Sequence, residues 1–259
     1  MSARDLDTGR LGPIGLTELN ERAALQTRVD RKYLLPRRDA HRVIAELVPT
    51  TRVLEIGGIR SFAYDSVYFD TPDLTSYLLA ARRRRHRFKI RTRTYVDSDL
   101  CFLEVKTRDA RGATVKDRLP YSPVDRATIG PGRDYVDTML GGRYDIAAFA
   151  PTLVTRYQRT TLYLPATDSR ATVDTDLALE DAHGRGLRLP GLAIVETKTG
   201  STASAVDRLL WARGHRPTQV SKYATGLAAL RPDLPDGPWR RTLRRHFVPA
   251  DGYCPVHAA

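Results

Sequence analysis

Most of the strand-like segments in this chain alternate charged with apolar residues, and this two-residue period constrains the fold more than any other feature. The segments are rich in Val, Thr, Tyr, Phe and Ile, which favour strands. Short, hairpin-like intervals separate them, and this spacing predicts a largely antiparallel sheet or barrel. Eight strands are expected, over residues 27–35, 61–70, 86–96, 100–108, 113–122, 153–164, 170–180 and 191–199.

Apolar residues at helical spacing occur between these strands, so we expect an α+β protein. Residues 1–26 are expected to form a leader and a first helix with Thr17 as its N-cap, and Ser201 or Thr202 should cap the fifth helix. Prolines and glycines after residue 230 predict a basic tail, 231–259, in which 239–247 forms either a short basic amphipathic helix or a partly ordered surface segment. The expected helices before this tail cover residues 14–25, 37–48, 72–84, 134–140, 202–213 and 221–230.

Separating each strand into its two faces gives, in all strands but one, a charged row opposite an apolar row. In residues 86–96, for example, Lys89 and Arg91 share one face while Phe88 and Ile90 share the other. A solvated outer face explains such a row in a single strand. Its recurrence, with an acid-x-Lys pattern at 30–32, 104–106 and 196–198, favours a charged interior common to all the strands.

The positive charge of the chain indicates an anionic ligand. The 42 Lys and Arg residues against 30 Asp and Glu give a net charge of +12. Only six of these cations are lysines and five of the six lie on the charged rows, which indicates a need for compact ammonium groups rather than planar guanidinium groups. Because isolated charge inside a barrel is costly, a polyanion such as a triphosphate, with a divalent cation held by carboxylates, would stabilise such an interior.

Several segments together resemble the triphosphate tunnel metalloenzymes, and within them the VTC domain, the catalytic unit of the vacuolar transporter chaperone polyphosphate polymerase and of its bacterial relatives. The similarity runs over residues 27–230. The resemblance implies an antiparallel eight-stranded β-barrel, the triphosphate tunnel, flanked by helices. The segments that carry it are RVDRKYLL, KIRTRTY, FLEVKTR followed by TVKDRL, RYQRTTLY, RATVDTDL, AIVETKT and QVSKYATGL.

The resemblance also implies an ATP-dependent polyphosphate polymerase, a phosphotransferase that uses Mn²⁺ or Mg²⁺. Glu196 would hold the metal, helped by Asp174, Asp176 or Glu104, although an ion pair with Lys198 is the structural alternative for Glu196. Gln219 departs from the eukaryotic pattern, in which a lysine stands two residues before the serine. The implied catalytic cations are Lys32, Lys89, Arg91, Lys106, Arg159, Arg170 and Lys222, and the implied substrate-binding residues are Lys116, Tyr157, Lys198 and Ser221.

Two other functions fit the same charge pattern. One is a tunnel-type inorganic or nucleoside triphosphatase, in which water accepts the phosphoryl group, and the other is a non-catalytic module that binds polyphosphate or nucleic acid. The basic run 82–87 has few aromatic residues near it for base stacking, so nucleic acid is not the expected partner. ATP, triphosphate and polyphosphate are the expected partners, although the chain has no P-loop or kinase signature. No motif identifies a membrane-protein partner.

The cysteines and the apolar segments predict a cytoplasmic protein. Cys101 and Cys254 are too few for a disulfide framework or a four-ligand zinc site. The longest apolar stretches are much shorter than the roughly 20 residues that a transmembrane helix needs. The N-terminal residues also lack the apolar core of a secretory signal. We therefore expect a cytoplasmic location and no transmembrane segment.

Overall fold

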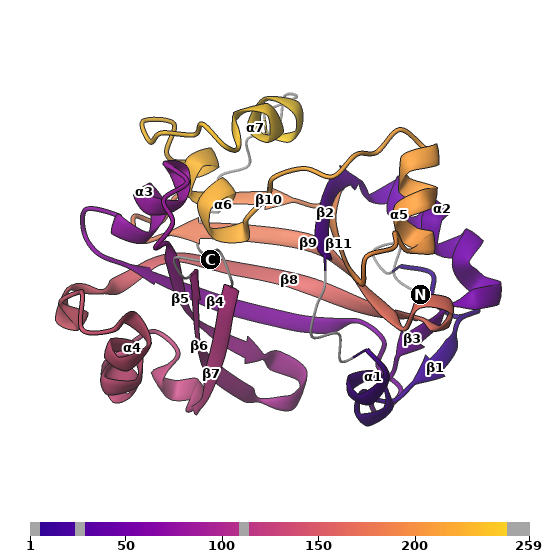
Figure 1. Ribbon diagram of the computed structural model, residues 1–259, viewed down its shortest axis with the longest axis horizontal. Coiled ribbons are helices and arrows are strands. Elements are labelled where there is room, and N and C mark those ends of the chain that lie inside the picture. Colours follow the sequence, from indigo (N-terminus) through magenta and orange to yellow (C-terminus); the bar gives the residue numbers. More distant parts are fainter. Residues whose placement is uncertain (1–5, 24–28, 109–113, 248–259) are drawn as a thin grey trace. The chain divides into compact units, whose positions relative to one another are not determined.

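The computed structural model describes residues 6–23, 29–108 and 114–247, which form two compact units (Figure 1). The first unit comprises residues 1–62, 157–177 and 189–220, and the second comprises residues 63–156, 178–188 and 221–259. Two long strands, β8 (Ala150–Leu164) and β9 (Ser169–Asp181), contribute residues to both units. Each unit combines antiparallel strands with helices, so the expected α+β class is confirmed.

The first unit is built on β2 (Val29–Pro36), β11 (Leu192–Thr199), β9 and the second half of β8, in that order across the sheet. Strand β11 pairs antiparallel with both β2 and β9. Two short strands, β1 (Gly12–Ile14) and β3 (Arg52–Leu54), pair in parallel. The helices of this unit are α1 (Leu16–Arg22), α2 (Arg37–Leu47) and α5 (Ala205–Ala212).

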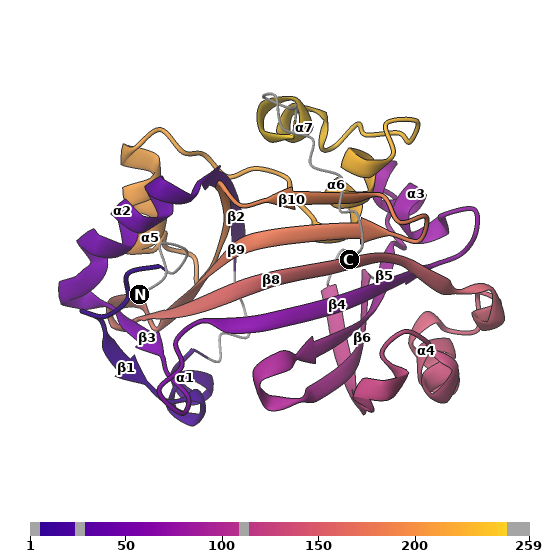
Figure 2. The same ribbon diagram turned by 180° about the vertical axis from the view of Figure 1, so that it is seen from behind.

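Helices α2 and α5 lie side by side and cover the apolar face of β2 and β11 (Figures 1 and 2). Tyr33, Leu35 and Val195 belong to this core, and each is at most 3% exposed. Because side chains alternate along a strand, Lys32 and Glu196 lie on the opposite face. The first unit therefore has the apolar row and the charged row that the sequence predicts.

In the second unit the strands follow the order β8, β4 (Phe62–Asp70), β5 (Phe88–Tyr95), β6 (Leu100–Arg108) and β7 (Thr114–Tyr121). The strands from β4 to β7 pair antiparallel with their neighbours, and β10 (Gly186–Leu189) pairs with β9. The helices of this unit are α3 (Thr75–Ala81), α4 (Arg133–Leu140), α6 (Lys222–Leu230) and α7 (Arg240–His246).

The apolar face of this second sheet portion packs against α4, which lies beside β6 (Figure 2). Ile90 and Leu103 are fully buried in this core together with Val136 of α4. Gly132 immediately precedes α4, and a Cβ at this position would lie only 2.4 Å from Cδ2 of Leu103. The close approach of chain and sheet here therefore requires glycine.

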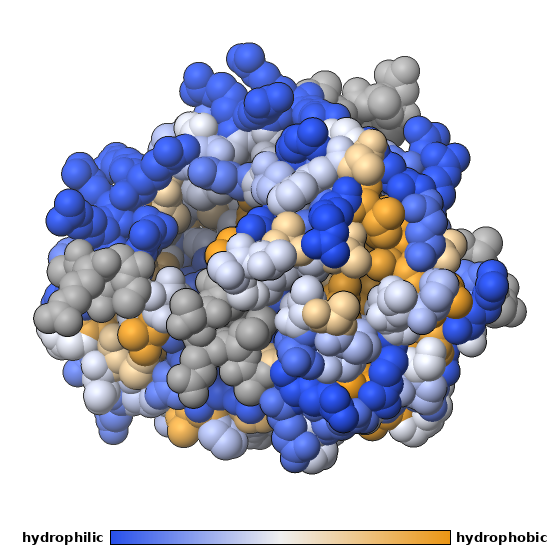
Figure 3. All heavy atoms as spheres, turned by 45° about the vertical axis from the view of Figure 1, so that its right-hand side comes forward, coloured by the Kyte–Doolittle hydropathy of each residue, from blue (hydrophilic) through white to orange (hydrophobic). Residues whose placement is uncertain are grey.

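Hydrophilic residues predominate on the face shown in Figure 3, and hydrophobic residues appear there in limited areas. This distribution agrees with the 28% of charged residues in the chain. Within the described ranges, no helix is both long and apolar enough to cross a membrane. Cys101 is a buried free thiol, as expected, whereas Cys254 lies outside the described residues.

The structure confirms all eight predicted strands and corrects the expected ends of several helices. The expected helix 72–84 is shortened to α3, because Leu74 and Arg83 adopt positive φ angles of 58° and 53° at its two ends. The predicted caps were wrong, since Gly15 rather than Thr17 precedes α1 and Ser204 caps α5. Of the two alternatives for 239–247, the structure shows the short basic helix, α7, and Trp239 before it is buried with its ring 5.7 Å from that of Tyr77.

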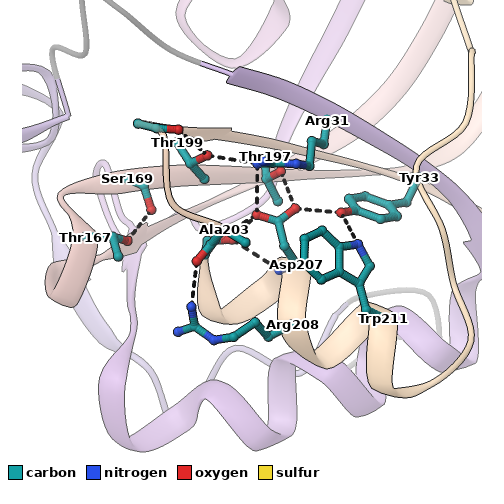
Figure 4. A network of polar contacts seen from close by, with 12 residues as sticks. Arg31, Tyr33, Thr167, Ser169, Thr197, Thr199, Ala203, Asp207, Arg208 and Trp211 are labelled. Atoms are coloured by element: carbon teal, nitrogen blue, oxygen red, sulfur yellow. Dashed lines mark hydrogen bonds and ion pairs between the residues drawn. The ribbon is translucent and has the colours of Figure 1, made fainter.

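A buried carboxylate joins α5 to the sheet of the first unit (Figure 4). Oδ1 of Asp207 accepts hydrogen bonds from the hydroxyls of Tyr33 at 2.6 Å and Thr197 at 2.7 Å. Oδ2 accepts from the backbone N–H of Ser204 at 2.8 Å and from its hydroxyl at 2.7 Å. Burial and the hydrogen bond to Asp207 raise the pKa of Tyr33, so this phenol stays a donor at neutral pH. The fully enclosed carboxylate is thus satisfied by groups from β2, β11 and the start of α5.

Replacing Asp207 with alanine is expected to lower the free energy of unfolding by about 3 kcal/mol or more, because buried donors would lose their acceptor. Urea-induced unfolding at pH 7 measures this change. The matched control is Glu21→Gln, which changes an exposed carboxylate on α1 and should alter the free energy by less than about 0.5 kcal/mol. A loss of under about 1 kcal/mol in Asp207→Ala would contradict the assigned role.

Candidate phosphate-binding site

Three lysines stand directly opposite one another on adjacent strands of the second unit. The register pairs Lys89 of β5 with Lys106 of β6, and Lys106 with Lys116 of β7. Residues opposite each other in an antiparallel pair have Cβ atoms about 5 Å apart, and like charges in such positions are destabilising. A row of three ammonium groups is therefore expected only where an anion compensates it. We call these three residues the lysine row.

Ser221 contacts Lys89, the residue at one end of the lysine row. The ammonium group of Lys89 donates a hydrogen bond to Oγ of Ser221 at 2.9 Å. The same oxygen accepts from the backbone N–H of Ala224 at 3.2 Å, so Ser221 is also the N-cap of α6. Lys222 follows as the first residue of this helix and is half-buried. The structure thus brings the Ser-Lys motif of the sequence to the charged face of β5.

A buried carboxylate occupies the next position along the same face. Glu104 is only 2% exposed, and it lies opposite Arg91 on one side and Arg118 on the other. Its oxygens accept from Nη2 of Arg91 at 2.6 Å and from Nζ of Lys116 at 2.8 Å. Burial would raise the pKa of Glu104, but the charges of Arg91 and Lys116 outweigh it and hold the pKa below its ordinary value. Glu104 is therefore an anion that orients two of the predicted cations.

Aromatic side chains of β4 and α6 pack next to Arg91. Nη1 of Arg91 donates to the hydroxyl of Tyr68 on β4 at 3.1 Å, and the Tyr68 ring stacks on Tyr223 of α6 at 5.2 Å. The Tyr223 hydroxyl donates to Asp70, which is 1% exposed and also accepts from the backbone N–H groups of Ser76 and Tyr77. Burial raises the pKa of Asp70 against these hydrogen bonds. This chain of contacts fixes the start of α6 relative to β4 and β5.

The first unit carries a second cluster of predicted site residues. Glu196 lies opposite Lys32 in the ladder, and its oxygens are 3.8 Å from Nζ of Lys32 and 3.7 Å from Nζ of Lys198. Lys198 in turn lies opposite Arg170 of β9. Burial and the charges of Arg170 and Arg159 lower the pKa of Lys198, against the opposing effect of Glu196. A bound anion would relieve this cationic crowding.

Arg159 is fixed by a bidentate ion pair within the first unit. Its Nε and Nη2 donate to the two oxygens of Asp174 at 2.6 and 2.8 Å, and the Asp174 side chain is 1% exposed. The guanidinium lies 5.3 Å from the ring centre of Tyr157. Asp176, expected in the same row, has a φ of 52° and pairs with Arg37 at the start of α2. The positive φ therefore interrupts the strand pattern at Asp176.

The predicted residues thus fall into two groups, one in each unit. Sequence reasoning missed Tyr68, Asp70 and Tyr223, although Tyr68 and Asp70 alternate along β4 and so share the face of Arg91. Gln219 is exposed. The second unit contains Lys89, Arg91, Lys106, Lys116, Ser221 and Lys222, and the first contains Lys32, Tyr157, Arg159, Arg170, Glu196 and Lys198.

The carboxylates differ in how well they fit a divalent metal ion. Asp174 and Glu104 each make contacts of 2.6 Å with a guanidinium, whereas the ammonium groups lie 3.7 and 3.8 Å from Glu196. Among the residues that the structure describes, no three His, Cys, Asp or Glu side chains cluster as a metal site. Mg²⁺ commonly binds through one or two carboxylates together with substrate phosphates and water. Glu196 fits a metal shared with a phosphate ligand rather than an all-protein site.

Comparisons with known proteins identify the family and the fold. A family model described as the VTC domain matches residues 27–231. A crystal structure of a putative adenylate cyclase from Bacillus halodurans has a TM-score of 0.51 and 14% identity, over 76% of this chain and 95% of that chain, and shows the shared fold. A putative adenylyl cyclase from Hippeastrum, described as having a dominant triphosphatase activity, has a TM-score of 0.47 and 17% identity, over 78% and 96%. No curated protein matches the chain.

The pKa of Glu104 gives a prediction about acid stability. Because the folded pKa lies below the ordinary 4.5, the contribution of Glu104 is complete above about pH 4.5 and is lost as the pH falls through the folded pKa. Glu104→Gln should lower the free energy of unfolding at pH 7 by about 2–3 kcal/mol. The difference between the variant and the wild type should then shrink as the pH falls below about 4.5, as urea titrations at each pH would measure. A difference independent of pH, or the same trend in the Glu21→Gln control, would contradict this assignment.

Proposed function

Because the chain belongs to the VTC domain family, we propose that it is a polyphosphate polymerase-type phosphotransferase that uses ATP. The observation that carries the proposal is the lysine row, in which Lys89, Lys106 and Lys116 stand directly opposite one another on β5, β6 and β7. Compact ammonium groups suit the densely charged oxygens of a phosphate chain. The first unit has its own cluster of cations, the ammonium groups of Lys32 and Lys198 and the guanidinium of Arg170.

The proposed reaction transfers the γ-phosphoryl group of ATP to the end of a polyphosphate chain. The bond between the γ-phosphorus and its bridging oxygen breaks, and ADP leaves with the electron pair. A terminal oxygen of the chain forms the new phosphorus–oxygen bond. Negative charge spreads over the transferred group in such reactions, so catalysis depends on positioning and on nearby cations more than on a protein nucleophile.

The residues of this chain would act by binding and orienting phosphates. The lysine row would bind successive phosphate oxygens, with Lys89 positioned by Ser221. Arg91 and Arg159 are each held in one orientation by a buried carboxylate, Glu104 and Asp174 respectively. Pre-oriented guanidinium groups stabilise developing charge without reorganising during the reaction.

A divalent ion, Mn²⁺ or Mg²⁺, is part of the proposal. Glu196 would hold it together with the phosphates of the substrate. When bound, the ion would neutralise charge on the phosphate oxygens.

A tunnel-type triphosphatase is the second candidate function. Gln219 favours it, because a neutral side chain stands where the pattern of the polymerases has a lysine, and one cation for the phosphate chain is lost. The two activities share the bond that breaks and differ in the acceptor, since water takes the place of the polyphosphate oxygen.

Incubating the purified protein with ATP and Mn²⁺ separates these functions. The polymerase produces a ladder of long chains on a gel, whereas a triphosphatase releases orthophosphate without a ladder. Tight binding of tripolyphosphate without turnover would leave a binding module and would reject the enzymatic proposal. Omission of the metal should abolish turnover if the ion is required.

Substitution of one lysine in each unit tests the site residues. Lys106→Ala and Lys32→Ala are each expected to lower kcat/KM at least about 100-fold, because each removes a proposed phosphate-binding cation. The control Arg188→Ala removes an exposed positive charge on β10 and should change kcat/KM by less than about twofold. Steady-state ATP turnover measures all three variants, and equal activity in all of them would reject the site.

A further inference from the structure

The positive charge of the second unit continues beyond the lysine row. The antiparallel register that pairs Lys89 with Lys106 places Arg87 opposite Arg108 one step further along, and the backbone N–H of Arg108 donates to the carbonyl of Arg87 at 3.0 Å. By the two-residue period, these two arginines share the face of Lys89 and Lys106. From Arg91 on β5 to Arg87, the residue just before this strand, the cations span about 13 Å.

A turn of exposed arginines lies just before Arg87 in the chain. Arg82, Arg83, Arg84 and Arg85 link α3 to β5, and all four are exposed. The backbone N–H of Arg84 donates to the carbonyl of Leu79 at 2.8 Å, so the turn is anchored on α3. We call these four residues the arginine turn.

Three members of the arginine turn lie away from the carboxylates of the described residues. Within the part of the chain that the structure describes, Arg82, Arg84 and Arg85 have no carboxylate within 4.0 Å. The nearby Arg87 is partly buried, and burial together with the charges of Arg108 and Arg83 lowers its pKa. Guanidinium groups are therefore crowded together at this end of the sheet. An extended polyanion would relieve that crowding.

The charge and the lack of exposed aromatic rings identify the kind of partner. Single-stranded nucleic acid is usually held by aromatic side chains that stack on the bases. The arginine turn offers none, since the neighbouring Phe88 is 5% exposed and belongs to the apolar core. A phosphate chain without bases needs only cations in a line, as the lysine row and the arginines provide.

We propose that the arginine turn and the Arg87–Arg108 pair bind the portion of a linear polyphosphate chain that extends beyond the lysine row. This inference rests on the proposed function, since it assumes that the lysine row binds phosphates. It adds that affinity depends on chain length. A triphosphate would occupy the lysine row alone, and a long chain would reach the arginine turn as well.

The test compares two ligands in the full-length protein. Equilibrium binding of tripolyphosphate and of long-chain polyphosphate is measured for the wild type and for Arg84→Gln/Arg85→Gln. The double variant should bind tripolyphosphate within about twofold of the wild type and long chains about five- to tenfold more weakly. The dependence of log Kd on log salt for the long chain should lose about 0.7 per missing contact, or about 1.4 in total.

A charge-matched control separates this site from the general field of a basic protein. Arg38→Gln/Arg188→Gln removes the same net charge at two exposed arginines of α2 and β10, and should leave the affinity for both ligands unchanged. An equal loss in this control, or an equal loss for both ligands in Arg84→Gln/Arg85→Gln, would overturn the inference.

Two further outcomes tell the inference apart from the proposed function. If the wild type does not bind tripolyphosphate, the proposed function fails first. If it binds tripolyphosphate normally and the double variant retains full affinity for long chains, only the chain-length inference fails.

A loss of poly-uridine binding in the double variant, with unchanged polyphosphate binding, would instead assign the arginine turn to RNA and reject the proposal.

Discussion

Repulsion between like charges on neighbouring strands is the constraint on which the charged face of this protein depends. Lys89, Lys106 and Lys116 stand in register on β5, β6 and β7, an arrangement that destabilises a sheet by itself. The protein compensates it in part by placing Glu104 one step away, where it accepts from Lys116. The proposed phosphate ligand would complete this compensation. Stability and ligand binding would then be linked through the same side chains.

Buried carboxylates orient two arginine side chains of the charged face. Burying a charged group is costly unless it is paired and hydrogen-bonded, and Glu104 and Asp174 meet this condition through Arg91 and Arg159. Each pair fixes a guanidinium that would otherwise have many rotamers. The apolar cores on the opposite faces keep the strands in register, so that the fixed charges keep their positions.

The eight long strands could be predicted because their alternation extends over many residues, whereas β1, β3 and β10 have only three or four residues and show no readable period. The cap of α5 was misplaced because several Ser and Thr residues precede the helix. Ser204 is selected by Asp207 three residues later, which completes a capping box and accepts from Tyr33 and Thr197. A choice among equivalent local caps thus depended on distant residues.

Local sequence alone determined which residues are strand-forming and which face of each strand is charged, because side-chain direction in a strand follows directly from position. The tertiary structure decided which strands are neighbours and in what register, since these depend on packing between distant segments. Only that register sets Lys106 between two other lysines, and only packing turns Glu104 and Asp174 into buried partners of arginines. The sequence therefore predicted a phosphate-binding chemistry, and the pairing of the strands decided its geometry.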